Sequence, residues 1–436
     1  MKKYLLALSL LLAAAHTPAQ VLPLREQAAV INQLLAERFD KLLPDMMAQT
    51  GIDMWIVVSR EYNEDPVQKT MLPAEWLNAR RRTVLLFYRD PANGRVERLA
   101  VARYNVGDSI AAAWDMKKFP EQWDALADLV RQRKPHKIAL DTSRHFGHAD
   151  GIDHTDYNEL LQALPAEYRA RVVSAEPLAV RWLETRTDSE MRIYPQMIEA
   201  THRIIAEGFS ERVITPGVTT SEDVVWWFRQ KIRDLGYDTW FHPSVEIQRQ
   251  GKDQPDGGVI QPGDLLHVDI GITYLRLNTD VQQHAYVLKP GESAAPAALV
   301  QAFGRANRLQ DILTAQFRQG RTGNQVLAAT LARARAEGLN PVIYTHPIGY
   351  HGHAAGPTIG MWDMQGGVPG SGDEALRYRT AYSIELSAAT AVEGYAQPVR
   401  MMLEEDAYFD QAGVRYIGGR QQELLLVPRR PSPAAQ

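Results

Sequence analysis

The chain has 436 residues, of which 45% are hydrophobic and 23% charged, and it contains no cysteine. This length and composition are typical of a globular protein with two domains. The absence of cysteine excludes disulfide bonds, thiolate nucleophiles and cysteine-ligated zinc sites. The formal net charge of -4 gives no reason to expect nucleic acid or an anionic membrane as a partner.

The first nineteen residues have the features of a secretory signal peptide. Lys2 and Lys3 precede an apolar run over residues 4–15, and small residues follow at positions 17–19. A charged start, a short apolar core and small residues near a cleavage site are typical of such peptides. The apolar run is shorter than the roughly 20 residues that span a bilayer. We therefore expect residues 1–19 to be removed, which gives a periplasmic or secreted protein that begins at Gln20 and has no membrane anchor.

The next part of the chain predicts an α/β domain. Apolar residues at helical spacing predict a helix over residues 24–50. Four short β-type runs follow and alternate with two helical stretches. The strands are expected at 54–58, 83–88, 98–102 and 137–140, and the helices at 119–133 and 156–164. This alternation favours a first domain over residues 20–186, which ends where Thr187 or Asp188 can cap the next helix.

Residues 145–154 are rich in histidine and aspartate and could bind a metal by composition. Glycines and alternating Asp and His are more typical of an ordered loop with local hydrogen bonds to the Asp side chains. The functional alternative is a contact with the entrance of a partner subunit's active site.

The second half of the chain predicts two helix pairs and several strands. Helices are expected at 189–212, 220–236, 295–318 and 323–337, and strands at 340–345, 380–388, 398–404 and 422–427. These elements define a second domain over residues 187–428. The last residues, 429–436, have the composition of a disordered tail.

Two aspartates lie near the start of this second domain. Asp269 lies in an apolar run, where a lone carboxylate is costly unless it is paired or bound to a metal. A hairpin with its turn at residues 273–277 would bring Asp280 beside it. Because two adjacent carboxylates repel, a proton or a cation must lie between them. An exposed turn aspartate is the simpler interpretation of Asp280 taken alone.

Three further segments carry histidine or glutamate. Residues 346–353 contain three histidines interleaved with glycines, which let the backbone and the imidazoles approach a ligand closely. Glu385 lies inside one apolar strand, and Glu404 lies at the end of another. Together with the two aspartates, these residues form a set of mostly oxygen donors that indicates a site for divalent cations.

In their order and spacing, these residues resemble the pita-bread metallopeptidase family, which includes methionine aminopeptidase, aminopeptidase P, prolidase and creatinase. The resemblance covers roughly residues 25–428. It implies an α/β (α+β) protein, with an N-terminal creatinase-like domain followed by a pita-bread catalytic domain. The family's ordered metal ligands fall on Asp269, Asp280, His346, Glu385 and Glu404. Glu405 is the alternative for the last ligand, one residue further on.

The resemblance also implies roles for these residues. The five ligands would hold two divalent cations, for which Mn²⁺ suits the oxygen donors and Co²⁺, Zn²⁺ or Fe²⁺ are alternatives. Two such cations lower the pKa of a shared water and polarise a substrate carbonyl. Glu385 would accept and donate the proton. His353, seven residues after His346, would donate a hydrogen bond to the tetrahedral intermediate.

The sequence departs from the family's pattern at three places. Peptidase members carry a histidine about 17–18 residues before the first ligand aspartate, and residues 248–252 contain none. Pro347 follows the ligand histidine where glycine is usual, and Leu386 follows Glu385 where proline is usual. His242 belongs to a different segment, so we hypothesise that His351 takes the role of the missing histidine.

The function implied by the resemblance is a homodimeric metallo-aminopeptidase that acts on small peptides with proline in the second position. A prolidase-type dipeptidase and a creatinase-like hydrolase or lyase of a small non-peptide substrate are the alternatives. The missing histidine favours the second of these. A metal-free binding protein is a third hypothesis, against which the intact ligand set argues.

Overall fold

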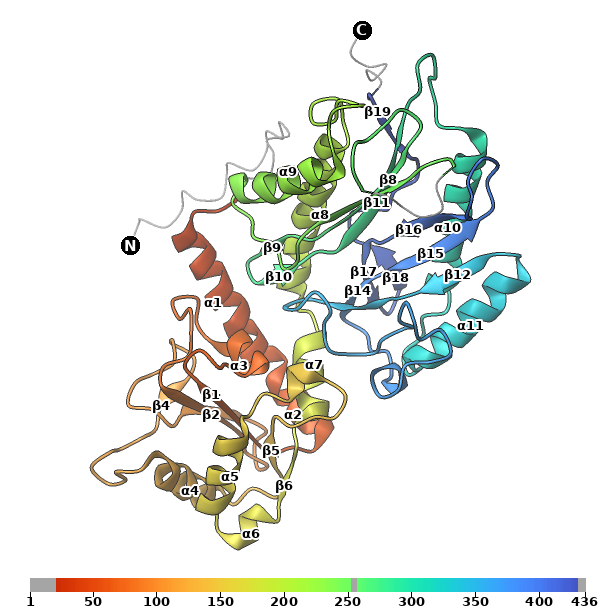
Figure 1. Cartoon of the computed structure of the whole chain (residues 1–436). Coiled ribbons are helices and arrows are strands. Elements are labelled where there is room, and N and C mark those ends of the chain that lie inside the picture. Colours follow the sequence, from red (N-terminus) through yellow and green to blue (C-terminus); the bar gives the residue numbers. More distant parts are fainter. Residues whose placement is uncertain (1–20, 252–256, 430–436) are drawn as a thin grey trace, which may run out of the picture.

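The computed structural model describes residues 21–251 and 257–429. The predicted signal peptide, and the predicted tail from residue 430 onward, lie outside the described residues. The described chain forms two lobes (Figure 1), and each lobe combines helices with β-sheet, as the sequence predicts. Among the described residues, no helix combines the length and the apolar character needed to cross a bilayer.

The N-terminal lobe is built on a six-stranded sheet with the strand order β4-β3-β2-β1-β5-β6. Its strands are β1 (Met54–Arg60), β2 (Arg82–Arg89), β3 (Val96–Ala100), β4 (Ala111–Ala112), β5 (Ile138–Leu140) and β6 (Val172–Ser174). Its helices are α1 (Leu24–Lys41), α2 (Leu43–Thr50), α3 (Pro66–Met71), α4 (Gln122–Arg133), α5 (His154–Ala163), α6 (Ala166–Arg169) and α7 (Glu176–Glu184), with a short 3-10 turn at Gly147–Ala149.

Alternate residues of β1 pack on opposite faces of this sheet. Trp55 and Val57 belong to the core beneath α1, α2 and α7, whereas Ile56 and Val58 belong to the core beneath α4 and α5. This division follows from the two-residue period of a strand. The predicted helical segment over residues 24–50 is confirmed, and it is divided into α1 and α2 because Pro44, in the first turn of α2, cannot donate a hydrogen bond to the preceding turn.

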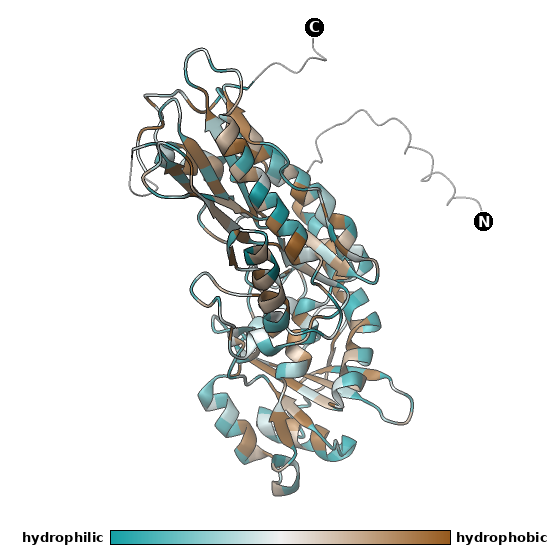
Figure 2. Cartoon of the chain, turned by 90° about the vertical axis from the view of Figure 1, so that its right-hand side faces the viewer, coloured by the Kyte–Doolittle hydropathy of each residue, from teal (hydrophilic) through white to brown (hydrophobic). Residues whose placement is uncertain are grey.

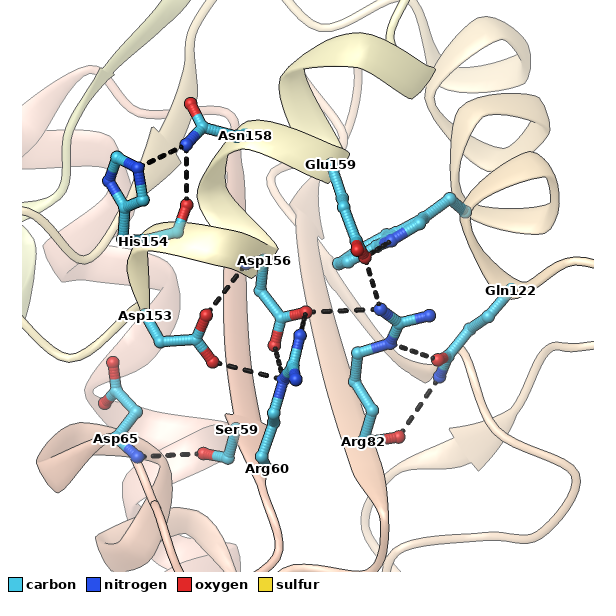
Figure 3. Close-up of polar contacts among 11 residues, drawn as sticks. Ser59, Arg60, Asp65, Arg82, Gln122, Asp153, His154, Asp156, Asn158 and Glu159 are labelled. Carbon is cyan, nitrogen blue, oxygen red and sulfur yellow. Dashed lines mark hydrogen bonds and ion pairs between the residues drawn. The ribbon is translucent and has the colours of Figure 1, made fainter.

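Helix α5 is held on this sheet by a charged network, drawn in Figure 3. The Asp156 carboxylate accepts hydrogen bonds from Arg60 at 2.8 and 2.9 Å and from Arg82 at 3.2 Å. Asp153 caps the helix through the backbone N–H of Asp156, and Asp150 accepts from the N–H of Ser143. The predicted ordered loop over residues 145–154, with local hydrogen bonds to aspartate, is confirmed.

Two buried carboxyl groups face each other inside the N-terminal lobe. Asp65 caps α3 through the N–H groups of Val67 and Gln68, and Asp141 accepts from the indole of Trp55 at 2.7 Å. Burial raises the pKa of Asp65 to about 6 and raises the pKa of Asp141 well above its usual range. Since two buried carboxylates so close together repel, the pair binds a proton more readily than an isolated aspartate does.

The C-terminal lobe places curved sheets between two helix pairs, α8 (Asp188–Gly208) with α9 (Ser221–Asp234), and α10 (Ala297–Thr314) with α11 (Gly323–Ala336) (Figure 1). Its sheets have the orders β19-β11-β8-β7, β12-β15-β16 and β13-β14-β17-β18, with a small β10-β9 hairpin. The strands are β7 (Ser244–Gln248), β8 (Leu265–Ile270), β9 (Thr273–Tyr274), β10 (Leu277–Asn278), β11 (Val281–Val287), β12 (Asn340–Ile343), β13 (His346–Ile348), β14 (Thr380–Ser383), β15 (Leu386–Thr390), β16 (Val399–Leu403), β17 (Asp406–Asp410), β18 (Gly413–Tyr416) and β19 (Leu425–Val427), and a 3-10 turn spans Ser371–Asp373.

Each helix pair covers its own part of the sheets. One hydrophobic core joins α8 and α9 to β7, β8 and β11, and another joins α10 and α11 to β12, β15 and β16. In Figure 2 the strands are mostly brown, whereas the helices carry teal residues between their brown ones. Helix α8 begins with a capping box in which Thr187 and Glu190 bond each other's backbone, which confirms Thr187 as the predicted cap.

The two lobes meet at a buried ion pair. Nη1 of Arg38 in α1 lies 3.0 Å from Oε1 of Glu190 in α8, and both side chains are fully buried. Tyr350 donates its hydroxyl to the same carboxylate at 3.1 Å. A second contact is made by Arg276, at the tip of the β9–β10 hairpin, which donates to the backbone carbonyls of Leu72 and Pro73.

Candidate metal centre

Irregular points in the C-terminal sheets place the predicted ligands. Asp269 lies in β8 and Asp280 directly before β11, and the hairpin between them has its turn at Leu275 and Arg276, as predicted. His346 opens β13. The single strand predicted over residues 380–388 is wrong, because it breaks at Glu385, whose carbonyl accepts hydrogen bonds from the segment that joins β12 to β13. Glu404 lies at the similar break between β16 and β17.

The side chains of the five predicted ligands lie close together. Nε2 of His346 lies 3.8 Å from Oδ2 of Asp280, 3.9 Å from Oε2 of Glu385 and 3.6 Å from Oε1 of Glu404. Ligand atoms of Asp269, Asp280 and Glu404 also converge within 4.8 Å of one another. The five predicted ligands therefore form two overlapping groups that share Glu404.

The imidazole of His346 presents a lone pair to this cluster. Its Nδ1 lies 3.0 Å from the carbonyl oxygen of Pro347, and a carbonyl can only accept, so Nδ1 carries the proton. Nε2 then points a lone pair at carboxylate oxygens, with no hydrogen between them. Oδ1 of Asp269, Oδ1 of Asp280 and Nε2 of His346 are buried and have no hydrogen-bond partner. Divalent cations satisfy this donor set, and a fixed Nδ1–H bond of this kind is typical of metal-binding histidines.

The electrostatics of the cluster also favour a cation. Burial raises the pKa of the Asp269, Asp280 and Glu385 carboxyl groups well above the usual range, and repulsion from Glu404 raises each of them further. Without cations, the cluster therefore binds protons more readily than exposed carboxyl groups do. With cations, all four carboxylates can ionise.

Glu404 is the glutamate directed into the cluster, and Glu405 is directed away from it. Glu405 accepts from Gln283 at 3.0 Å and lies 2.7 Å from the imidazole of His202. Consecutive residues of an extended chain point to opposite sides, so only one of the two glutamates can face the centre.

Of the two histidines predicted to be catalytic, His353 lies beside this cluster and His351 lies apart from it. His353 has a ring nitrogen among the atoms that converge with Asp280 and His346, and its ring meets that of His346 edge-on at 4.8 Å. Burial lowers the pKa of His353 to about 4, so it is neutral and can donate one hydrogen bond. His351 is absent from the converging groups of the described chain, and its ring stacks on His148 of the N-terminal lobe at 4.2 Å.

The structure adds residues that the sequence analysis misses. The Ser383 hydroxyl donates to Glu404 Oε1 at 2.5 Å, and the Gln282 amide donates to both ligand glutamates. The indole ring of Trp240 meets His353 edge-on at 5.2 Å. Ser383 and Gln282 each lie two residues from a predicted ligand, so the two-residue period of a strand is the signal that could find them.

The model of metallopeptidase family M24 matches residues 196–415, half of the chain, so the chain belongs to this family and is a metallopeptidase, as the resemblance implies. The matched segment contains all five converging ligands. A search of curated proteins finds no match.

Solved structures resemble the chain over nearly its whole length. An X-Pro aminopeptidase from Thermotoga maritima has 16% identity and a TM-score of 0.62, and the match covers 88% of this chain and 100% of that one. An Xaa-Pro dipeptidase from Bacillus anthracis has 16% identity and a TM-score of 0.57, with coverages of 93% and 100%. The dipeptidase PepE from Mycobacterium ulcerans has 19% identity and a TM-score of 0.58, with coverages of 92% and 99%. These likenesses confirm the predicted pita-bread fold.

Proposed function

We propose that this protein is a dinuclear metallo-aminopeptidase that hydrolyses the bond between an N-terminal residue and a following proline. The observation that carries the proposal is the convergence of two ligand groups on the shared Glu404. The names of the similar structures, an X-Pro aminopeptidase and an Xaa-Pro dipeptidase, support a substrate with proline in the second position.

The side chains around the centre suit peptide hydrolysis. When bound, two divalent cations, Mn²⁺ by preference, polarise the scissile carbonyl and supply a nucleophile at neutral pH. Glu385 would take the proton from the attacking water and give it to the leaving proline nitrogen, because its carboxylate lies within the cluster, 3.9 Å from Nε2 of His346. Neutral His353 donates a hydrogen bond to the oxygen that gains negative charge.

His351 lies outside the converging groups of the described residues. Burial lowers its pKa to about 3, so it is a neutral imidazole, and its stacking on His148 places it where the two lobes meet. The proposal that it replaces the missing upstream histidine predicts that His351→Ala reduces turnover. Unchanged turnover would end that assignment and leave the exopeptidase proposal intact.

The test compares two substrates on the Mn²⁺-loaded chain from Gln20 onward. Release of the first residue from an Xaa-Pro-Xaa tripeptide is expected, and it should be lost in Asp269→Ala. Asp45→Ala, which removes an exposed carboxylate of α2, is the matched control and should keep full activity. Cleavage of an Xaa-Pro dipeptide alone would replace the proposal with a prolidase. No cleavage of either peptide by protein with bound metal would favour a creatinase-like hydrolase or lyase.

We also propose that the protein is exported and acts as a homodimer. The export proposal rests on residues 1–19 of the sequence, and N-terminal sequencing of the secreted chain should begin near Gln20. The homodimer proposal rests on the family resemblance, and light scattering should give twice the mass of one chain. A monomer that hydrolyses the tripeptide would reject the dimer alone.

A further inference from the structure

The phenol ring of Tyr344 lies beside the metal centre. Tyr344 is two residues before His346, in the link between β12 and β13, and residues two apart in an extended chain point to the same side. The centroid of its ring is 5.4 Å from that of His346 and 5.7 Å from that of His353. The backbone N–H of Tyr344 donates to the carbonyl of Glu385 at 3.1 Å, which holds the residue in this place.

The hydroxyl group of Tyr344 is free to donate a hydrogen bond. Within the described part of the chain it has no hydrogen-bond partner. The side chain is half-buried, and its oxygen is not sealed from solvent, so a molecule bound at the centre can reach it. Burial raises the pKa of this hydroxyl, and repulsion from the carboxylates of Glu385, Glu404 and Asp280 raises it further. The hydroxyl therefore lies near these ligands without bonding any of them.

A phenol in this position can stabilise the charge that develops during peptide hydrolysis. When water adds to a peptide carbonyl, the carbonyl oxygen gains negative charge, and a donor aimed at it binds more strongly in the transition state than in the substrate. A tyrosine hydroxyl stays protonated at neutral pH, so it can donate whether or not ions are bound. His353 supplies one such donor in the proposed function, and the ring of Tyr344 lies next to it. The indole N–H of Trp240, another ring beside His353, is already bonded to the Thr279 carbonyl at 2.9 Å.

We propose that Tyr344 is a further catalytic residue, whose hydroxyl donates a hydrogen bond to the scissile carbonyl oxygen as that oxygen gains negative charge. His353 donates the second bond to the same oxygen. The hydroxyl keeps its proton throughout, so no covalent bond of Tyr344 forms or breaks. This inference rests on the proposed peptide hydrolysis and deepens it by adding a donor to the reacting oxygen.

The test is Tyr344→Phe, which removes the hydroxyl and keeps the ring. In the Mn²⁺-loaded chain from Gln20 onward, kcat on the Xaa-Pro peptide that the wild-type protein cleaves should fall on the order of 100-fold, as for other lost donors of this kind. KM should change less than about threefold, because the bond forms mainly in the transition state. Bound metal, counted by mass spectrometry, should equal that of the wild-type protein.

A binding measurement gives a readout that does not depend on turnover. A phosphinic analogue of the same peptide carries negatively charged oxygens in place of the scissile carbonyl, and calorimetry should show that it binds Tyr344→Phe on the order of 100-fold more weakly than the wild-type protein. The product that begins with proline should bind both proteins alike. Tyr395→Phe is the matched control, since Tyr395 is also half-buried with a hydroxyl free of partners in the described chain, but packs on the core beneath α10 and α11. It should match the wild-type protein in every measurement.

Two results on an active wild-type protein would overturn the inference alone. Unchanged kcat and unchanged affinity for the analogue in Tyr344→Phe would show that the hydroxyl does not touch the reacting oxygen. Equal losses of affinity for the analogue and for the product would make Tyr344 a residue that binds the ground state instead. A wild-type protein that cleaves neither Xaa-Pro peptide would reject the proposed function, and this inference with it.

Discussion

Replacement of Arg38 by methionine should destabilise the whole protein. Its guanidinium lies fully buried between the lobes, 3.0 Å from Glu190, and it also donates to the Thr185 carbonyl at 2.8 Å. Removing one partner of a buried ion pair costs about 3–5 kcal/mol, because the other charge is left buried and unpaired. Glu190 would keep Arg186 at 3.8 Å and the Tyr350 hydroxyl. The lower end of the range, about 3 kcal/mol, is therefore expected.

Calorimetric unfolding of the ion-free protein measures this loss. With an unfolding entropy of about 2.1 cal/mol/K per residue, about 3 kcal/mol lowers the midpoint by about 3–4 °C if both lobes unfold together. Lys41→Met is the matched control, since it removes an ion pair to Glu37 from an exposed position of the same helix, and less than about 0.5 kcal/mol is expected.

A double-mutant cycle separates the ion pair from the packing of the long side chain. Glu190→Gln alone should also destabilise the protein, because it leaves Arg38 and Arg186 without their carboxylate. The double variant should be more stable than the sum of the two single effects by about 1 kcal/mol or more. The reasoning fails if Arg38→Met costs no more than Lys41→Met, or if the two changes are additive.

Three further outcomes are expected. The free energy of unfolding of the wild-type protein should fall as pH rises from about 4 through about 6, because the raised pKa of Asp65 makes the folded state bind more protons than the unfolded state in that range. In urea unfolding, Asp141→Asn should recover on the order of 2 kcal/mol of this free energy at pH 8 and little at pH 4. Gly352→Ala should lower kcat on the order of tenfold with Mn²⁺ binding retained, since a Cβ would lie 2.3 Å from the Trp240 ring, which contacts His353. Gly366→Ala, where a Cβ meets open space, should be neutral, and equal kinetics of the two variants would show that the Trp240 ring does not position His353. The raised pKa values of Asp269, Asp280 and Glu385 make the ion-free protein lose stability above about pH 4. Mn²⁺ should therefore raise the thermal midpoint more at pH 8 than at pH 5, and equal rises would show that these carboxyl groups do not titrate in this way.

The ligand set could be predicted from the sequence because each ligand lies in a distinctive local pattern. Asp269 is a carboxylate within an apolar strand, and the hairpin turn before Asp280 is visible as a spacing. The choice of Glu404 over Glu405 rested on the family's pattern alone, because it depends on which side of the chain faces the centre. That direction is set by the pairing of Glu404 with Gln282 in a neighbouring sheet, which is a long-range contact.

Breaks in the predicted elements had different causes. The break before α2 was visible in the sequence, because Pro44 cannot continue a helix. The break at Glu385 was not, since apolar residues precede and follow Glu385 directly. It arises because the Glu385 carbonyl accepts hydrogen bonds from Tyr344 and Thr345, which lie between β12 and β13. Tertiary contacts decide such a break, and local pattern does not contain them.

The contact of Arg276 with the N-terminal lobe bears on how the protein is assembled during synthesis. Arg276 is in the turn that joins the strands of Asp269 and Asp280, and its guanidinium binds carbonyl groups about two hundred residues earlier in the chain. The ribosome releases that earlier lobe first, so the hairpin emerges onto a surface that is already folded. A C-terminal half expressed alone lacks this template. The N-terminal lobe, which holds none of the five predicted ligands, thus supports the hairpin that positions two of them.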